Sequence, residues 1–408
     1  MSVDKPRDFD VAIVGGGMVG ASFALALRST RLRVLLIENV PADSAGQPSF
    51  DERTTALGNG SRQIFETLDV WPAMQAASAA IRSIHVSDAG RFGVARLDAR
   101  EQGVDAFGYV VPNRVIGRAL WDALRVAPNV TLAVPAKLES ADLSDDGVEL
   151  DVSIDGKRET VRAAVAVAAD GAGSALRASA GIDAEVEDYE QVAIVLNAAT
   201  ERPSDGEAFE RFTPSGPLAV LPVAGGGYAV IWAVRPDRAA DLMALDENAF
   251  ADELLAAFGW RAGRWNKIGR RHTYPLLLSR AAETTSGRVV LIGNAAQALH
   301  PVAGQGFNLG LRDAATLAEM LAGAAERPDF NELLAKFAAW RAEDRRGVTR
   351  FTDGLVKLFG SELPGAGLVR NFGLLLFDLS PTAKRALSRV SWGFAGRMPR
   401  LARGLPLE

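Results

Sequence analysis

The feature that most constrains this chain is a glycine-rich turn near its N-terminus, set between an apolar run and an alanine-rich helical pattern. The run DVAIV at residues 10–14 indicates a strand. Gly15, Gly17 and Gly20 fit G-x-G-x-x-G, in which the glycines permit a tight turn, approach to a pyrophosphate and close helix packing. The next apolar run ends at Glu38, 21 positions after Gly17, where a carboxylate can bond ribose hydroxyls. These features together predict a βαβ unit that binds a dinucleotide.

A second stretch, residues 293–319, has the same character. It follows the β-branched run VVLI at residues 289–292, which predicts a buried strand. A loop punctuated by Gly304 and Gly306 comes next, and beyond Asn308 the apolar residues recur at helical spacing. A small-residue loop that leads into a helix offers free backbone N–H groups and a positive dipole end. The stretch therefore predicts a site for an electron-rich ring or an anionic group.

A third signal is the sequence ADGAGSALR, which begins at Ala169 and follows an apolar strand pattern. Asp170 and Gly171 would lie at the carboxyl edge of a parallel sheet, where ligands bind in such folds. Two arginines are further candidates. Arg53 is expected either at the cofactor phosphates or on a solvated surface turn. Arg114 is expected either to reach the cofactor or to lie on a helix surface. The residues leave both alternatives open.

Composition excludes several kinds of site. The chain has 408 residues, no cysteine and three histidines that lie far apart, so disulfides, thiolate metal sites and redox dithiols are ruled out and no metal site is expected. Redox chemistry would need a bound cofactor. The net charge of −5 gives no basic field for nucleic acid. No apolar run approaches the ~18 residues of a membrane span, and the first ten residues lack the apolar core of a signal peptide. We therefore expect a cytoplasmic protein.

The middle of the chain has a different pattern. Short alternating segments between residues 130 and 165 predict an antiparallel meander, and those at 191–199, 208–212, 218–223 and 228–234 predict a second antiparallel sheet. We expect an α/β fold, with a discontinuous Rossmann-like domain, an inserted antiparallel-sheet substrate domain and a C-terminal helical segment. The boundaries that we predict are 1–72, 107–180 and 279–345 for the first, 73–106 and 181–278 for the second, and 346–408 for the third.

The three signals stand in one order along the chain, and together they resemble the p-hydroxybenzoate-hydroxylase-like FAD-dependent aromatic monooxygenases. The segments DERTTALGNGSRQIFE, GYVVPNR and HPVAGQGFNLGLRDAATLAE are most similar to the ubiquinone-biosynthesis hydroxylases, especially the 2-octaprenyl-6-methoxyphenol hydroxylase type. This resemblance covers residues 8–403 and is weakest between 180 and 265. One departure is Asn294, because the larger class usually has aspartate there. Asparagine keeps the hydrogen-bonding ability and loses the charge.

The resemblance implies a set of site residues. Gly15, Gly17 and Gly20 would meet the FAD pyrophosphate, and Glu38 would meet the adenosine ribose. The backbone of residues 304–308 would face the pyrimidine edge of the flavin. The full set expected at the cofactor is Gly15, Gly17, Met18, Val19, Gly20, Glu38, Arg53, Arg114, Asp170, Gly171, Asn294, Gly304, Gly306, Phe307 and Asn308. The residues expected at the reacting ring are His300, Pro301, Gly304 and Gln305, and a structural role for His300 remains an alternative.

The resemblance also implies a reaction. NADPH or NADH would reduce FAD, and one atom of dioxygen would be transferred to an electron-rich phenol ring, here a polyprenyl phenol intermediate of ubiquinone biosynthesis. No general base for the phenol could be named from the sequence. Two alternatives stay open: a related flavin hydroxylase of a small soluble aromatic, and a non-catalytic flavoprotein subunit of a quinone-biosynthesis complex.

The last part of the chain is basic. Between residues 380 and 407 it carries six lysine or arginine residues and no acidic one. Such a segment can rest on an anionic membrane or bind a partner, and the alternative is a helix packed on its own domain. The predicted partners are thus a lipid-tailed phenol, a quinone-biosynthesis complex and, through this segment, the surface of the inner membrane.

Overall fold

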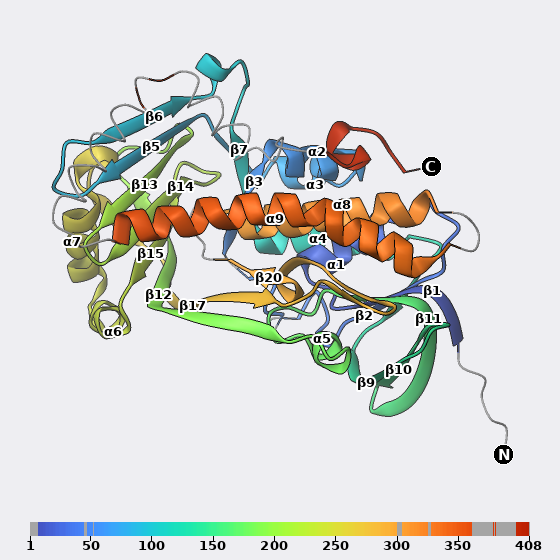
Figure 1. Ribbon diagram of the computed structural model, residues 1–408. Coiled ribbons are helices and arrows are strands. Elements are labelled where there is room, and N and C mark those ends of the chain that lie inside the picture. Colours follow the sequence, from blue (N-terminus) through green and yellow to red (C-terminus); the bar gives the residue numbers. More distant parts are fainter. Residues whose placement is uncertain are drawn as a thin grey trace.

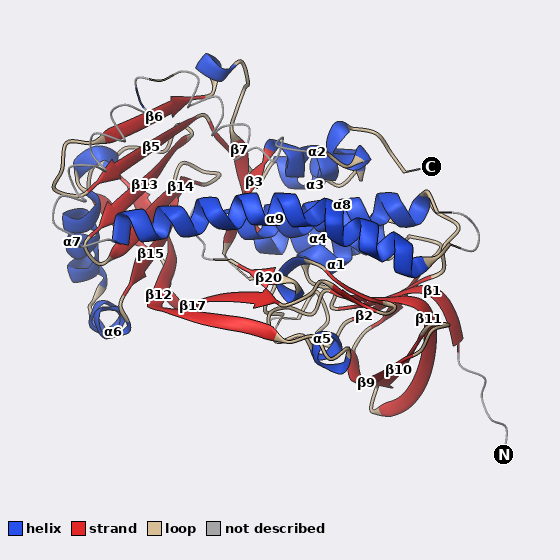
Figure 2. Ribbon diagram, viewed as in Figure 1, coloured by secondary structure: helices blue, strands red, loops and turns tan. Residues whose placement is uncertain are grey.

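The structure is a computed structural model that describes residues 7–44, 47–51, 53–299, 304–324, 328–360, 378, 380 and 397–407. Figure 1 shows two sheets side by side, joined by long strands, with one long helix, α9 (Phe330–Gly360), running across the view. Figure 2 shows that helices lie against the strands at both ends of the molecule. No helix in the described ranges is long and apolar enough to cross a membrane.

The first sheet contains the predicted βαβ unit. Its order is β18-β19-β11-β1-β2-β8, and β9 and β10 continue it from β11. The inner strands are parallel, and each ends at the same edge of the sheet. The strands are β1 (Arg7–Val14), β2 (Val34–Ile37), β8 (Val130–Ala133), β9 (Ala136–Leu143), β10 (Val148–Ile154), β11 (Lys157–Ala168), β18 (Thr285–Ser286) and β19 (Val289–Leu291).

Helices cover one face of this sheet. The inward side chains of β1, β2 and β11 form one core with α1 (Met18–Ala26), α4 (Asn113–Leu124) and α8 (Gln305–Ala322). The opposite face is covered by β9, β10 and α5 (Ala175–Ser179). The parallel strands are therefore buried on both sides, which explains why they are continuous apolar runs rather than alternating ones.

Two of the strand predictions were incomplete here. The segment at 130–134 was expected in the antiparallel meander, but β8 pairs in parallel with β2 and extends the main sheet. The segments at 161–165 and 164–169 are one strand, β11, which pairs with β10 over its first half and with β19 over its second. Pairing partners are set by tertiary contacts, so alternation alone did not distinguish the two sheets.

The second sheet has nine strands among the described residues, in the order β20-β17-β12-β15-β14-β13-β5-β6, with β16 beside β12. Its outer face packs on α6 (Pro236–Ala244) and α7 (Glu247–Phe258). The strands are β5 (Ser83–Asp88), β6 (Val94–Asp98), β12 (Ala184–Thr200), β13 (Glu207–Thr213), β14 (Gly216–Pro222), β15 (Tyr228–Val234), β16 (Trp265–Ile268), β17 (His272–Ala281) and β20 (Gln297–Ala298). We retain the domain boundaries given above as a proposal.

A small third sheet, β3-β7-β4, lies between the two larger ones. It consists of β3 (Thr54–Gly58), β4 (Ala79–Ile81) and β7 (Gly108–Pro112), and it is followed in the chain by α4. Two further helices, α2 (Asn59–Thr67) and α3 (Trp71–Gln75), connect β3 to β4. The remaining short helical turns are η1 (Arg100–Gln102), η2 (Trp260–Ala262), η3 (Gly293–Ala295) and η5 (Arg400–Arg403).

A buried cluster of charges joins α8 to α9 (Phe330–Gly360). Arg341 is 1% exposed; its Nε lies 2.7 Å from Asp313 Oδ1 and its Nη2 lies 2.6 Å from Asp344 Oδ2. Arg312 and Arg345 complete the cluster, with contacts of 2.8 Å to Asp344 and 3.0 Å to Asp313. Burial favours the neutral form of Asp344, but Arg312 and Arg341 outweigh it and lower its pKa. These ion pairs hold α9 against α8.

The end of the chain packs on the first sheet's helices. Leu401 is buried, its carbonyl accepts from Thr67 Oγ1 at 3.0 Å, and the Arg400 N–H donates to Glu319 at 2.5 Å. Arg397 lies over the ring of Trp340 at 3.7 Å. Helix α9 also runs without interruption across the predicted boundary at 345/346. Arg403 is exposed, and the remaining basic residues of this segment, Lys384, Arg385 and Arg389, lie outside the described residues.

Candidate functional site

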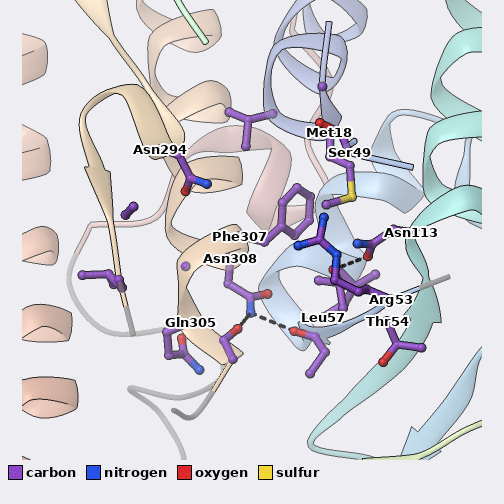
Figure 3. A pocket seen from close by; sticks show the side chains of 18 of the residues that line it. Met18, Ser49, Arg53, Thr54, Leu57, Asn113, Asn294, Gln305, Phe307 and Asn308 are labelled. Carbon is purple, nitrogen blue, oxygen red and sulfur yellow. Dashed lines mark hydrogen bonds between the residues drawn. The ribbon is translucent and has the colours of Figure 1, made fainter. Parts of the chain in front are cut away.

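A cavity of about 1350 Å³ extends from the glycine-rich turn to the inner face of the nine-stranded sheet. Drug-sized ligand pockets are roughly 300–1,000 Å³, so this cavity has room for a dinucleotide together with a second molecule. Its walls come from the carboxyl edge of the parallel sheet, the start of α8, β3 and the strands β5, β6, β13, β14 and β15. Figure 3 shows the part nearest α8, where side chains from α1, β3 and α8 converge.

The glycine-rich turn forms one end of the cavity. Gly15 has φ +102°, and a Cβ there would lie 2.5 Å from the carbonyl oxygen of Ala169, so only glycine fits between the ends of β1 and β11. Gly17 precedes α1, and it lines the cavity together with Met18 and Val19. The first N–H groups of α1 therefore face the cavity with the positive end of the helix dipole, as an anion site requires.

Gly20 has a different part. It does not line the cavity, and a Cβ at this position would lie 1.9 Å from the Gly15 carbonyl oxygen. The sequence predicts Gly20 both at the pyrophosphate and in helix packing, and the structure shows the packing contact. Its lack of a side chain lets α1 lie directly against the turn.

Glu38 lies at the end of β2, as expected, and lines the cavity. Its carboxylate accepts from the backbone N–H of Gly16 at 2.5 Å and of Val40 at 2.8 Å. Gln47, which is 5% exposed, donates to the same carboxylate at 3.3 Å. The acid is thus fixed beside the glycine turn by three donors, in a position to accept from ribose hydroxyls.

Asp170 follows β11, and one of its two carboxylate oxygens is available to accept a hydrogen bond from a ligand. Its Oδ2 accepts from the N–H groups of Ala175 at 2.8 Å and Leu176 at 3.3 Å, which caps α5. Its Oδ1 is buried and has no hydrogen-bond partner within the described part of the chain. Because a buried carboxylate oxygen rarely lacks a donor, this atom fits a ligand hydroxyl in the adjoining cavity. Gly171 lines the same wall with φ +87°.

The start of α8 forms the opposite wall. Gly304 (φ +59°), Gln305, Gly306 and Phe307 all line the cavity, and the first turn of α8 directs its N–H groups toward it. The side chain of Asn308 holds this turn in place. Its Oδ1 accepts from Gly58 N–H at 2.9 Å. Its Nδ2 donates to the carbonyls of Ala56 and Gly304 at 2.9 and 2.8 Å (Figure 3).

Asn294, the departure from the larger class, lines the cavity and is exposed. It lies in the tight turn η3, which begins at Gly293 with φ +59°. A Cβ on Gly310 of α8 would lie 2.9 Å from the Gly293 Cα, so the turn and α8 approach each other through two glycines. Asn294 can donate or accept there without the cost of a buried charge.

The two candidate arginines, Arg53 and Arg114, lie in different places relative to the cavity. Arg53 lines the cavity, and its guanidinium bonds Asp51 at 2.6 Å and the Pro48 carbonyl at 2.8 Å while lying 4.5 Å from the centre of the Tyr274 ring. Arg114 is exposed at the start of α4 and is not among the residues that line the cavity. The structure therefore places Arg53 at the site and Arg114 on the helix surface.

Of the residues expected at the reacting ring, Gly304 and Gln305 line the cavity, whereas His300 and Pro301 lie outside the described residues. The sequence reasoning missed other lining residues. Asn113 accepts from Thr55 Oγ1 at 2.6 Å, and Ser49 lies against Gly17. Glu210 was missed as well, although a single acidic residue at an inward position of an alternating strand can be recognised in the sequence.

These observations fit FAD. The glycine cradle and α1 suit a pyrophosphate, Glu38 a ribose, and the first turn of α8 an electron-rich ring. Asp170 offers a free acceptor beside them. Bound FAD supplies the redox and oxygen-activating chemistry that side chains lack.

Comparison with known proteins agrees with this reading. A family described as FAD binding domain matches residues 8–352. The chain is 37% identical to the ubiquinone hydroxylase UbiL of Rhodospirillum rubrum, with 100% of this chain and 95% of that protein covered. It is 31% identical to the 3-demethoxyubiquinol 3-hydroxylase of Escherichia coli, over 94% and 98% of the two chains. The chain belongs to the FAD-dependent ubiquinone hydroxylase family.

The fold of this flavoprotein monooxygenase also matches solved structures. The p-nitrophenol 4-monooxygenase PnpA of Pseudomonas putida superimposes with a TM-score of 0.79 at 21% identity, over 96% of this chain and 99% of that one. At that identity the likeness concerns the fold alone. The predicted α/β fold, with a Rossmann-type parallel sheet beside an antiparallel one, is confirmed, as is the identification of an FAD-dependent hydroxylase.

Proposed function

We propose that this hydroxylase acts on a polyprenyl phenol intermediate of ubiquinone biosynthesis and uses NADPH or NADH with dioxygen. The observation that carries the proposal is the second half of the cavity. Its wall on the nine-stranded sheet is almost entirely aliphatic or aromatic, and it is continuous with the FAD end. Two relatives that match nearly the whole chain are named for hydroxylation in the ubiquinone series.

The apolar wall gives a lipid-tailed phenol two advantages. Burial of prenyl carbons contributes about 25 cal/mol per Å² of apolar surface, which holds the tail without directional contacts. The same wall excludes water from the ring and strengthens the polar contacts that remain. The lining residues that provide it are Ile81, Ile84, Val86, Leu97, Phe107, Phe212, Leu221 and Ile231.

The nicotinamide cofactor is a separate part of the proposal. A second G-x-G-x-x-G motif is not present in the sequence, so we propose that NADPH or NADH docks transiently beside bound FAD rather than in a domain of its own. The open rim near Asp170 and Gly171 supports this position, because a Cβ at Gly171 would meet no atom within 4 Å.

We also propose that the basic C-terminal segment brings the enzyme to the surface of the inner membrane or to a biosynthetic complex, where a lipid-tailed substrate is found. In the described part, Arg397 and Arg400 pack on the protein itself whereas Arg403 is exposed, so the contact would rely on Lys384, Arg385, Arg389 and Arg403. Co-sedimentation with anionic vesicles compares the full chain with the quadruple variant K384Q/R385Q/R389Q/R403Q. Equal binding by two folded proteins would exclude this contact.

The substrate is tested in cells that lack this chain, with and without a plasmid copy. We expect mass spectrometry to show a polyprenyl phenol one oxygen atom short of the next intermediate, and the plasmid to remove it. An unchanged quinone pool, in a strain without a redundant hydroxylase, would contradict the proposal and leave a small soluble aromatic as the substrate. The purified flavoprotein with NADPH and a short-chain prenyl phenol gives a second test, read as formation of the hydroxylated product.

A further inference from the structure

One acidic side chain interrupts the apolar wall of the cavity. Glu210 lies in the middle of β13, where its neighbours on the same face are Val86 of β5 and Ala219 of β14. Ile231 of β15 continues this row beyond Ala219, and Ala95 of β6 continues it beyond Val86. All five residues line the cavity. A single carboxyl group is therefore held in an otherwise aliphatic row that faces the substrate half.

Glu210 has no partner that would explain its position structurally. Its Oε1 is buried and makes no hydrogen bond to any described residue. A buried polar atom without a partner destabilises the fold, so it calls for a ligand or a functional reason. The other titratable residues lining the cavity, Glu38, Arg53, Lys137 and Asp170, come from the FAD half.

The charged groups on the neighbouring strands do not neutralise it. Arg211 lies on the opposite face of β13, where it bonds the Ala257 carbonyl at 3.0 Å and Ser87 at 3.3 Å. His85 of β5 and Arg96 of β6 share that outer face through the same register. Asp88, near the end of β5, pairs with Arg91. The strands β14 and β15 carry no charged residue.

We propose that Glu210 accepts the proton of the ring hydroxyl of the bound phenol. The inference rests on the proposed function, since it concerns the same cavity. The O–H bond of the phenol breaks, its electron pair stays on the ring oxygen, and the proton is bound by a carboxylate oxygen of Glu210. Nothing is oxidised or reduced in this step. The ionised oxygen raises the electron density of the ring carbons ortho and para to it, where an oxygen atom is to be added.

The electrostatics of the site suit this task. Burial raises the pKa of Glu210 to about 7. A base works best when its pKa lies near the operating pH, and a phenol with a pKa of about 10 transfers its proton more readily to such a group than to an ordinary carboxylate. Among the described lining residues, the carboxylate would also be the one strong acceptor in the apolar half, so it would orient the hydroxyl end of the ring.

The test compares Glu210→Gln and Glu210→Asp with Glu207→Gln, a matched change at the exposed start of the same strand. The full-length flavoproteins are assayed with two geranyl phenols, one weakly acidic and one fluorinated so that it is ionised at the assay pH. Flavin content reports folding. For E210Q with the weakly acidic phenol we expect kcat to fall about 100-fold or more, with KM changed by less than about fivefold. E210D should recover part of the loss, and E207Q should match wild type.

Two further readouts separate a proton acceptor from a structural residue. The loss in E210Q should shrink to within about threefold for the fluorinated phenol, because that substrate needs no base. The wild-type kcat/KM should rise as pH increases through about 7, and E210Q should lack this rise. Equal losses with both phenols, or an E210Q profile like that of wild type, would overturn the inference while the proposed function stands.

Failure of the proposed function has its own signature, namely a wild-type enzyme that hydroxylates neither phenol. Binding of the weakly acidic phenol, followed by the flavin absorbance, then decides the role of Glu210. Affinity that rises through pH 7 in wild type and stays constant in E210Q supports it. The same pH dependence in both proteins overturns it.

Discussion

The side chain of Asn308 and the backbone of Gly58, 250 positions apart, are joined by a 2.9 Å hydrogen bond at the floor of the FAD site. The same amide oxygen accepts from Ser61 Oγ at 2.7 Å, and the amide nitrogen donates to the carbonyls of Ala56 and Gly304 at 2.9 and 2.8 Å. One buried amide thus fixes the start of α8 to the end of β3. All of its hydrogen bonds are made within the protein, so it positions the turn that we propose to face the flavin.

Replacing Asn308 by alanine should loosen that turn. The change leaves buried or partly buried groups on Gly58, Ser61, Ala56 and Gly304 without this partner, which we expect to cost about 2–4 kcal/mol of unfolding free energy. Affinity for FAD should fall at least tenfold in a flavin fluorescence titration. Asn294→Ala is the control, because Asn294 is exposed, and its unfolding free energy should stay within about 0.5 kcal/mol of wild type. A stable N308A protein with normal affinity would contradict this account.

Alanine substitutions at two glycines separate backbone strain from steric contact. Both Gly15 and Gly171 have positive φ, but a Cβ would lie 2.5 Å from the Ala169 carbonyl oxygen at Gly15 and would meet nothing within 4 Å at Gly171. Gly171→Ala should therefore cost about 1–2 kcal/mol. Gly15→Ala should cost more and should abolish FAD binding, because the ends of β1 and β11 must separate. Flavin content after purification and urea unfolding measure the two effects, and equal behaviour of the variants would refute the steric argument.

Removing Arg341 should destabilise the fold without touching the cavity. Arg341→Met leaves the buried carboxylate of Asp313 with Arg345 alone and takes one of two cations from Asp344. Breaking a buried ion pair on one side costs about 3–5 kcal/mol, and we expect a loss in that range by urea denaturation. Lys336→Met, which removes an exposed pair with Glu332 on the same helix, should change stability by less than about 1 kcal/mol. Similar losses in both variants would argue against the buried cluster as the anchor of α9.

The pH dependence of stability should contain two opposing contributions. Burial, with Arg261 and Arg96, lowers the pKa of His85 from 6.5 to about 4, so the unfolded chain binds more protons in that range and stability rises with pH. Burial raises the pKa of Glu210 from 4.5 to about 7, so the folded chain binds more protons and stability falls as pH rises. In wild type the two slopes largely cancel between about pH 4.5 and 6.5.

Substituting one of these two residues at a time should reveal the contribution of the other to the pH dependence of stability. Glu210→Gln should leave stability that rises with pH across this window, and it should be more stable than wild type at pH 8 by about 1–2 kcal/mol. His85→Gln should leave stability that falls with pH. Urea unfolding at pH 5.0, 6.5 and 8.0 measures both variants beside wild type. A wild-type slope that neither substitution alters would show that other groups set the pH response.

Local sequence patterns predicted the parts of this site that depend on neighbouring residues. The turn at Gly15, the acid Glu38 and a helix beyond Asn308 were predicted because each follows from chain geometry over a few positions, although the helix, α8, begins earlier, at Gln305. The strand at 228–234 was predicted with its observed bounds, because its side chains point alternately to the two faces of the sheet and are apolar on both.

What the sequence could not provide is pairing over long distances. Glu210 faces the cavity because β13 lies beside β5, more than 100 positions earlier, and no local signal specifies that partner. For the same reason Asn308 was expected only as part of a loop that presents its backbone, and its side-chain bonds to β3 were unforeseen. Arg114 was a candidate through its place next to GYVVP, but helix α4 turns it outward. Tertiary contacts decided each of these outcomes.

The strands β12 and β17 run from one large sheet to the other, and this has a consequence for making chimaeras between members of the family. Residues 184–188 pair with 277–281 beside the parallel sheet, while 192–195 pair with 272–275 in the antiparallel one. If the substrate-binding half were exchanged with a cut at residue 278, the pairing of β12 with β17 would be interrupted. Strands from two different proteins would then have to pair. Crossovers placed before Ala184 and after Ala281 would transplant the whole ribbon, so substrate preference and the alignment of the ring with the flavin would be inherited together.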